Sequence, residues 1–195
     1  FNNGNGAAKI ASPIQVSADK SWSNSACQAG WFGVTTGGQL WSNAQDNRNG
    51  ISGQNNTTDT SSPAQVGALT NWAGVYPGQT KGVIARKTDG TLWSWGNPYP
   101  DKAKAFLGGN NAFYAASSPV QIGVLTTWAK VIQTKYTVAA IKTDGTLWTW
   151  GYNSGGALGV GDTANRSSPV QVGALTNWLS TSGKFATGQV VMMGA

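Results

Sequence analysis

The acids, bases and nucleophiles of this chain form few combinations that could catalyse a reaction. General acid–base catalysis most often uses His or Glu, and the sequence contains neither. Its serines lack a histidine base, and Cys27, the single cysteine, has no histidine with which to form a nucleophilic dyad or a zinc site. We therefore predict no catalytic residue, no cofactor and no metal ligand.

The carboxylates do not change this interpretation. Asp89 and Asp144 each precede a glycine and are predicted to serve in hairpin turns. The others show no repeated spacing: Asp19, Asp46, Asp59, Asp101 and Asp162. We accordingly expect a protein that is not an enzyme.

The elements that carry these residues are repeated along the chain. A Ser-Pro-x-Gln-(Val/Ile) motif begins at the serines before Pro13, Pro63, Pro119 and Pro169, and a tryptophan follows each proline by nine residues. A period of about 50 residues indicates stacked supersecondary units. We predict one repeat domain over residues 1–195, with units at approximately 12–61, 62–117 and 118–167 and a partial unit at 168–195.

Each clear unit contains a β-hairpin signal. The segments 83–96 and 138–151 each contain two short apolar runs joined by Asp-Gly. Asp-Gly suits a type I′ turn because both central residues of that turn need positive φ. After the turn, Trp93 and Trp95 are two residues apart, as are Trp148 and Trp150, so each pair points to one face of its sheet. No stretch shows sustained helical periodicity, and the predicted fold is all-β.

A four-stranded sheet cannot bury such an aromatic face alone, so neighbouring sheets must cover it, as in a β-propeller. The chain holds about 3.5 such blades. The predicted structural core of the repeats consists of Trp72, Trp93, Trp95, Trp128, Trp148, Trp150 and Trp178.

Composition narrows the choice of partner. Only 10% of the residues are charged, and the net charge of +6 comes from basic residues scattered through the repeats. Such scatter favours solubility over nucleic-acid binding. No apolar run is long enough to span a membrane, and Cys27 is expected to be a small core thiol.

The repeat Lys-Thr-Asp-Gly-Thr-Leu-Trp-x-Trp-Gly, followed by Gly-x-Leu-Gly and Ser-Ser-Pro-x-Gln-Val, resembles that of the regulator of chromosome condensation family, and is most similar to the bacterial and bacteriophage versions. The resemblance covers most of residues 62–182 and implies a seven-bladed β-propeller. Members serve as nucleotide-exchange and chromatin-docking factors, enzyme inhibitors or surface-displayed modules. The exchange activity is not carried over, because its loops are not recognisable in this sequence.

The second unit has six extra residues in its loop. Aromatic and lysine side chains gather there and suit a protein interface, although the aromatic residues could instead fold back onto the blade. The candidate interface residues are Tyr99, Lys102, Lys104, Phe106, Phe113 and Tyr114.

Seven blades of this length need roughly 350 residues, so this chain does not close such a ring. It is either a fragment of a longer protein, one of several chains that assemble, or an open arc. The first unit, with Ser42-Asn43-Ala44 in place of x-Trp-Gly, is expected to be a degenerate blade.

Two hypotheses about function follow. The first is a structural or binding module, a bacteriophage virion component that decorates a capsid, neck or tail and contacts other virion proteins or further blades. The second is a soluble regulatory propeller that docks on chromatin, DNA or a small GTPase. The expected location is the virion, or otherwise the cytoplasm or the extracellular space as a soluble protein.

Overall fold

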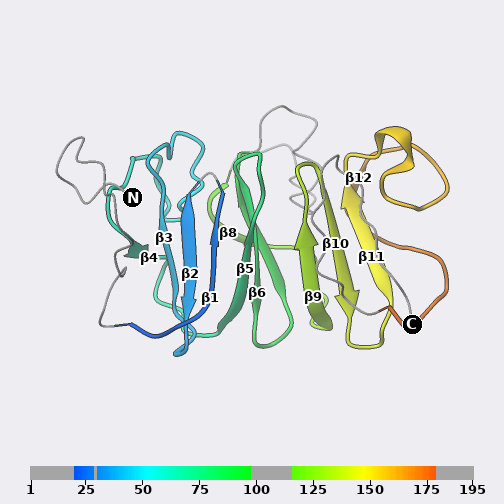
Figure 1. The fold of residues 1–195 in the computed structure, drawn as a ribbon, viewed down its shortest axis with the longest axis horizontal. Coiled ribbons are helices and arrows are strands. Elements are labelled where there is room, and N and C mark those ends of the chain that lie inside the picture. The colour runs from blue at the N-terminus through cyan, green and yellow to red at the C-terminus, as the bar shows by residue number, and fades with distance from the viewer. Residues whose placement is uncertain (1–19, 29, 98–115, 179–195) are drawn as a thin grey trace, which may run out of the picture.

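Three four-stranded antiparallel sheets make up the part of the chain that the structure, a computed structural model, describes: residues 20–28, 30–97 and 116–178. They stand side by side in chain order (Figure 1). The first sheet contains β1 (Trp22–Cys27), β2 (Trp31–Thr35), β3 (Leu40–Asn43) and β4 (Ala64–Gln65). The second contains β5 (Trp72–Pro77), β6 (Gly82–Lys87), β7 (Leu92–Gly96) and β8 (Ala116–Gln121). The third contains β9 (Trp128–Gln133), β10 (Thr137–Lys142), β11 (Leu147–Gly151) and β12 (Arg166–Gln171). The all-β prediction and the propeller-type stacking of blades are confirmed.

The sheets are offset from the sequence units by one strand. Pro119 and Pro169 lie inside β8 and β12, the last strands of their sheets, whereas Trp72, Trp128 and their neighbours begin the next sheet. In β8, the register shifts between the pairs Ser94↔Val120 and Gly96↔Ala116, so the proline sits in a bulge. A bulged edge strand tolerates the missing N–H of proline.

The tight hairpins form where Asp-Gly predicts them, but their turn type differs from the prediction. In the second sheet, Lys87 N donates to Thr91 O, and Gly90 N donates to Lys87 O. Gly90 has a φ of +78°, while Asp89 is not among the residues with positive φ. The loop therefore has three residues, Thr88, Asp89 and Gly90, which form a type I turn followed by a left-handed glycine. The predicted type I′ turn is wrong because Thr88 also belongs to the loop.

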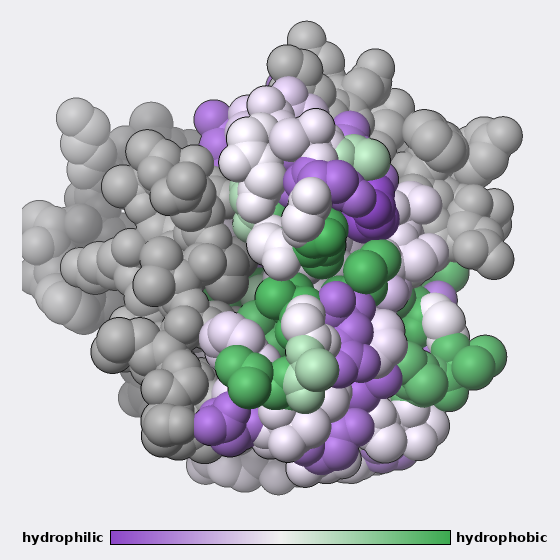
Figure 2. Space-filling view, turned by 90° about the vertical axis from the view of Figure 1, so that its right-hand side faces the viewer, coloured by the Kyte–Doolittle hydropathy of each residue, from purple (hydrophilic) through white to green (hydrophobic). Residues whose placement is uncertain are grey.

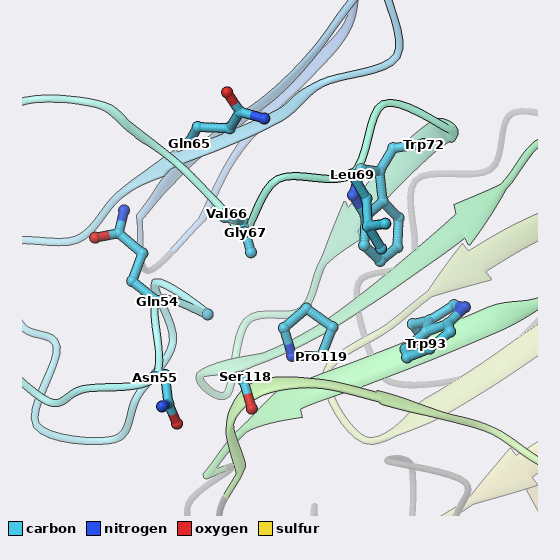
Figure 3. A pocket seen from close by; sticks show the side chains of 11 residues that line it. Gln54, Asn55, Gln65, Val66, Gly67, Leu69, Trp72, Trp93, Ser118 and Pro119 are labelled. Carbon is cyan, nitrogen blue, oxygen red and sulfur yellow. The ribbon is translucent and has the colours of Figure 1, made fainter.

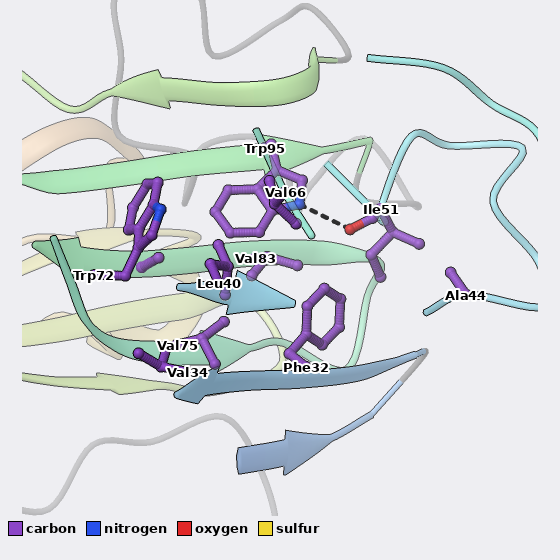
Figure 4. Close-up of a cluster of buried hydrophobic side chains, with 11 residues drawn as sticks. Phe32, Val34, Leu40, Ala44, Ile51, Val66, Trp72, Val75, Val83 and Trp95 are labelled. Carbon is purple, nitrogen blue, oxygen red and sulfur yellow. Dashed lines mark hydrogen bonds between the residues drawn. The ribbon is translucent and has the colours of Figure 1, made fainter. Parts of the chain in front are cut away.

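Buried side chains fill the space between consecutive sheets. On β6, Val83 and Ala85 face the first sheet, whereas Ile84 packs with residues of the third, as the alternation along a strand requires. Figure 4 shows the first of these layers, in which the indole Nε1 of the fully buried Trp95 donates to Ile51 O at 2.8 Å. Each sheet thus helps to bury its neighbour.

The first unit is less degenerate than the sequence indicates. It forms a complete four-stranded sheet, in which β4 is reduced to two residues paired with Trp41 and Ser42. Its turn carries the same kind of junction as the later units: Gly38 O accepts from Trp72 N at 3.0 Å. The equivalent carbonyls of Gly90 and Gly145 accept from Trp128 N and Trp178 N, so the tight turn of each sheet is tied to the start of the following segment.

Candidate functional site

The Lys-Thr-Asp-Gly-Thr-Leu-Trp motif forms one hydrogen-bonded network in each of the second and third sheets. In the third sheet, Asp144 Oδ1 accepts from both the backbone N–H and the hydroxyl of Thr146, at 3.0 and 2.7 Å. The Thr146 hydroxyl accepts from the indole Nε1 of Trp148 at 2.9 Å, and Lys142 Nζ lies 3.6 Å from the centre of that ring. The motif therefore locks a turn, an indole and a cation together.

The second sheet repeats this network with Asp89, Thr91, Trp93 and Lys87. The hydrogen bond from the backbone N–H of Thr91 contributes most to a lowered pKa of Asp89, and the bond from the Thr146 hydroxyl does the same for Asp144. Burial lowers the pKa of Lys87. Both aspartates are thus hydrogen-bonded within their turns.

The predicted core tryptophans lie on the layers between sheets. Trp95 and Trp150 are fully buried, Trp72 and Trp128 nearly so, and Trp93 and Trp148 are half-buried against the same clusters. Trp128 meets Trp148 edge to face at 6.1 Å. Trp178 packs on a third cluster, formed by Ala139, Ile141 and Leu147. That side of the molecule shows apolar and hydrophilic side chains next to one another (Figure 2).

The candidate interface residues of the second unit lie outside the described residues. This group comprises Tyr99, Lys102, Lys104, Phe106, Phe113 and Tyr114. Their role in an interface remains a prediction.

The other aspartates of the described residues hold loops. Asp46 forms ion pairs with Arg48 and, across the junction of the first two sheets, with Lys81. The hydrogen bond from Arg48 is the main cause of a strongly lowered pKa of Asp46. Asp59 accepts from a backbone N–H, and Asp162 pairs with Arg166. Asp19 and Asp101 lie outside the described residues.

Two buried asparagines, which were not predicted from the residue pattern, organise the loops after β3 and β11. The side chain of Asn153 accepts from Leu158 N at 2.8 Å and donates to Asp162 O at 2.9 Å. Asn47 makes the equivalent bonds, to Ser52 N and Thr58 O. The available signal was the shared spacing Asn-x-x-Gly-x-x-Gly, present at both positions.

Cys27 is exposed, so its prediction as a core thiol is wrong. It ends β1, where the alternating pattern directs it away from the packed layer. Within residues 20–28, 30–97 and 116–178, no helix is long and apolar enough to cross a membrane.

Leucines repeat on the segments that connect one sheet to the next. We call residues 66–71, 122–127 and 172–177 the linkers. Leu69 is 48% exposed, Leu125 40% and Leu175 58%, and Val124 beside Leu125 is 86% exposed. These three leucines follow the repeated glutamine by four residues, a signal that was present in the sequence but not used. Because the linkers occupy the same place on successive sheets, the leucines mark one rim of the molecule.

Comparison with known proteins supports the repeat assignment. Residues 144–185 match the regulator of chromosome condensation (RCC1) repeat. The fold is similar to that of Prp20p from Saccharomyces cerevisiae, with a TM-score of 0.62 and 17% identity over 77% of this chain and 38% of that chain. It is also similar to yeast RCC1 (Prp20) in its structure bound to Kap60, with a TM-score of 0.63 and 16% identity over 76% of this chain and 36% of that one.

The chain therefore spans well under half the length of these two structures. No curated protein sequence matches it. The stacked four-stranded sheets and these similarities show that the chain folds as blades of an RCC1-type β-propeller, and residues 144–185 match the RCC1 repeat itself.

Proposed function

We propose that the chain is a non-enzymatic binding module that contacts a protein partner through its linkers. The observation that carries this proposal is the set of exposed leucines at one position of successive blades. Exposed apolar side chains scattered singly need no explanation, but a repeated row on one rim suits an interface. The uncharged residues around them are also typical of an interface core, where charged residues are depleted.

The residues that could do chemistry support the same proposal. Asp89 and Asp144 are held by threonines of their own turns, and Asp46 is neutralised by Arg48 and Lys81. The polar groups of the described repeats thus stabilise loops.

The proposed setting is a bacteriophage virion, where such a module would decorate a capsid, neck or tail. The resemblance of its repeats to bacteriophage versions and its low content of charged residues, 10%, support this setting. Mass spectrometry of purified particles should then find the chain at a fixed ratio to the major structural protein. Its recovery only in the host lysate would contradict this location.

The alternative is docking on chromatin, DNA or a small GTPase. The net charge of +6 favours it, as do the binding of Prp20p to Gsp1p and histones and the complex of yeast RCC1 with Kap60. A salt titration separates the two proposals. A phosphate-neutralising binder loses affinity steeply between 50 and 200 mM salt, by roughly 10³-fold or more for several contacts, whereas a contact made by leucines should change little.

The interface itself can be tested by variants of the linkers. Leu125→Asp and Leu175→Asp place charges at exposed positions, so the fold should persist while the partner, purified with the wild-type chain from its source, is lost. Thr163→Asp, at an exposed position in the loop after β11, is the matched control. Retention of the partner by both leucine variants would refute the proposed surface.

A further inference from the structure

A groove of about 420 Å³ lies between the outer parts of the first and second sheets. Figure 3 shows its two sides: Gln65 and Val66 belong to the first sheet and its linker, while Pro119 and Trp93 belong to β8 and β7. Trp72 completes the floor. The groove therefore exists only because two blades are stacked, and its size suits part of a ligand chain.

Among the residues that the structure describes, the lining of the groove is uncharged. None of its eleven residues has an ionisable side chain. Lys87 lies 3.7 Å from the centre of the Trp93 ring, but it is only 6% exposed and does not line the groove. A charged ligand group would lose its hydration here without gaining an ion pair, so the groove selects a neutral occupant.

The floor favours an apolar side chain over a sugar ring. Trp72 and Trp93 meet edge to face, with ring centroids 6.0 Å apart and an interplanar angle of 77°. Because Trp72 is only 3% exposed, it offers no open face on which a flat ring could stack. Leu69 and Val66 add aliphatic surface beside these indoles, which together resemble the pocket for an anchoring side chain at a protein interface.

The mouth of the groove suits peptide backbone. Amide and hydroxyl groups come from four residues of the groove, Gln54, Asn55, Gln65 and Ser118. Pro119 lacks an N–H on the outer strand β8, so a ligand cannot add to this sheet as a regularly paired strand. An extended segment bound here would instead place a side chain in the groove and bond to these polar side chains.

Leu69 lines the groove and also belongs to the linker 66–71, so the groove is continuous with the proposed interface. We propose that the groove binds an uncharged, extended segment of the partner protein and takes one large apolar side chain, such as Leu, against Trp93 and Leu69, next to the nearly buried edge of Trp72. This inference rests on the proposed function, to which it adds the chemistry of the bound segment.

The test uses the indole ¹H–¹⁵N NMR signals of the chain, with Trp72→Phe and Trp93→Phe variants to assign two of them. The probes are capped pentapeptides Gly-Ser-x-Ser-Gly with x as Leu, Ala or Asp, and maltose as a neutral saccharide. The Leu peptide should shift both indole signals saturably, and the Ala peptide should bind at least about tenfold more weakly because it buries less apolar surface. The Asp peptide and maltose should leave both signals in place.

Ser118→Phe, which fills the groove from a half-buried position, should abolish the shifts, while Leu125→Asp, outside the groove, should preserve them. If Ser118→Phe does not fold, Asn55→Asp puts a charge at the mouth from an exposed position and should weaken the Leu peptide. Shifts caused by maltose alone, or by no probe, would overturn the inference. The two proposals can fail separately. If the groove test fails but the linker variants still abolish partner binding, the proposed function stands and only the groove is excluded. If the linker variants keep the partner, the proposed function fails, whatever the peptide probes show.

Discussion

Gly90 offers the sharpest test of how the blades are joined. Its φ of +78° is in the left-handed region, and a Cβ added there would lie 2.1 Å from Thr126 O, in the linker to the third sheet. Gly90 O also accepts from Trp128 N at 3.2 Å. Gly90→Ala should therefore strain its own backbone and also push the next blade away.

The backbone strain and the clash with the linker make separate contributions to the free energy of unfolding. A left-handed alanine costs about 1 to 2 kcal/mol. The clash with backbone adds about 1 to 3 kcal/mol, as for an overpacked core, or the loss of the Trp128 hydrogen bond adds about 1 kcal/mol. We expect Gly90→Ala to lower the free energy of unfolding by roughly 2 to 5 kcal/mol in total.

Gly123 is the matched control, since its φ is +58° and an added Cβ would meet nothing within 4 Å. Gly123→Ala should cost only the backbone strain, about 1 to 2 kcal/mol. Urea unfolding followed by circular dichroism measures both variants, and unchanged m-values would show that the unfolding transition is comparable. Equal losses for the two variants would refute the close approach of turn and linker.

Three further predictions concern the tryptophans, the turn aspartates and the buried asparagines. Trp150→Ala should lower the free energy of unfolding by about 3 to 5 kcal/mol because the ring is fully buried, and Trp148→Ala by less because it is half-exposed; the reverse order in urea unfolding would contradict the layer packing. Asp144 has a folded-state pKa below its unfolded value of about 3.9, so its contribution to stability is present above about pH 4 and is lost as the pH falls through the folded pKa. Asp144→Asn should therefore reduce the loss of stability between pH 7 and pH 3, measured by thermal unfolding, and an unchanged pH profile would exclude this role. Asn153→Ala should cost about 1 to 3 kcal/mol through unsatisfied loop groups and should speed proteolysis of residues 154–165, with Ser154→Ala, at an exposed position, as the control that should cleave at the wild-type rate.

The local features of the fold could be predicted from residue spacing. Trp93 and Trp95 share a face because strand side chains alternate, and Asp-Gly between apolar runs does mark a tight hairpin. The turn type was wrong because the dipeptide does not reveal how many residues its loop includes. Cys27 was misplaced because composition says little about which side of an edge strand a residue takes.

The candidate binding surfaces depended on contacts between distant segments. The linker leucines repeat in the sequence, yet the same spacing would equally suit buried positions, and only the packed sheets leave Leu69 and Leu175 exposed. The groove joins residues as far apart as Gly53 and Pro119, so no local pattern could predict it.

The sequence by itself determined that this protein is a repeated all-β chain with one aromatic face per sheet, because these properties follow from a period of two along each strand and of about 50 residues between units. Only the tertiary structure decided which indoles are buried and that β8 and β12, which contain the repeated prolines, pair as the last strands of their sheets. It also decided where polar and apolar groups meet between neighbouring sheets. Those outcomes depend on the stacking of one sheet against the next, which places in contact residues that lie many positions apart along the chain.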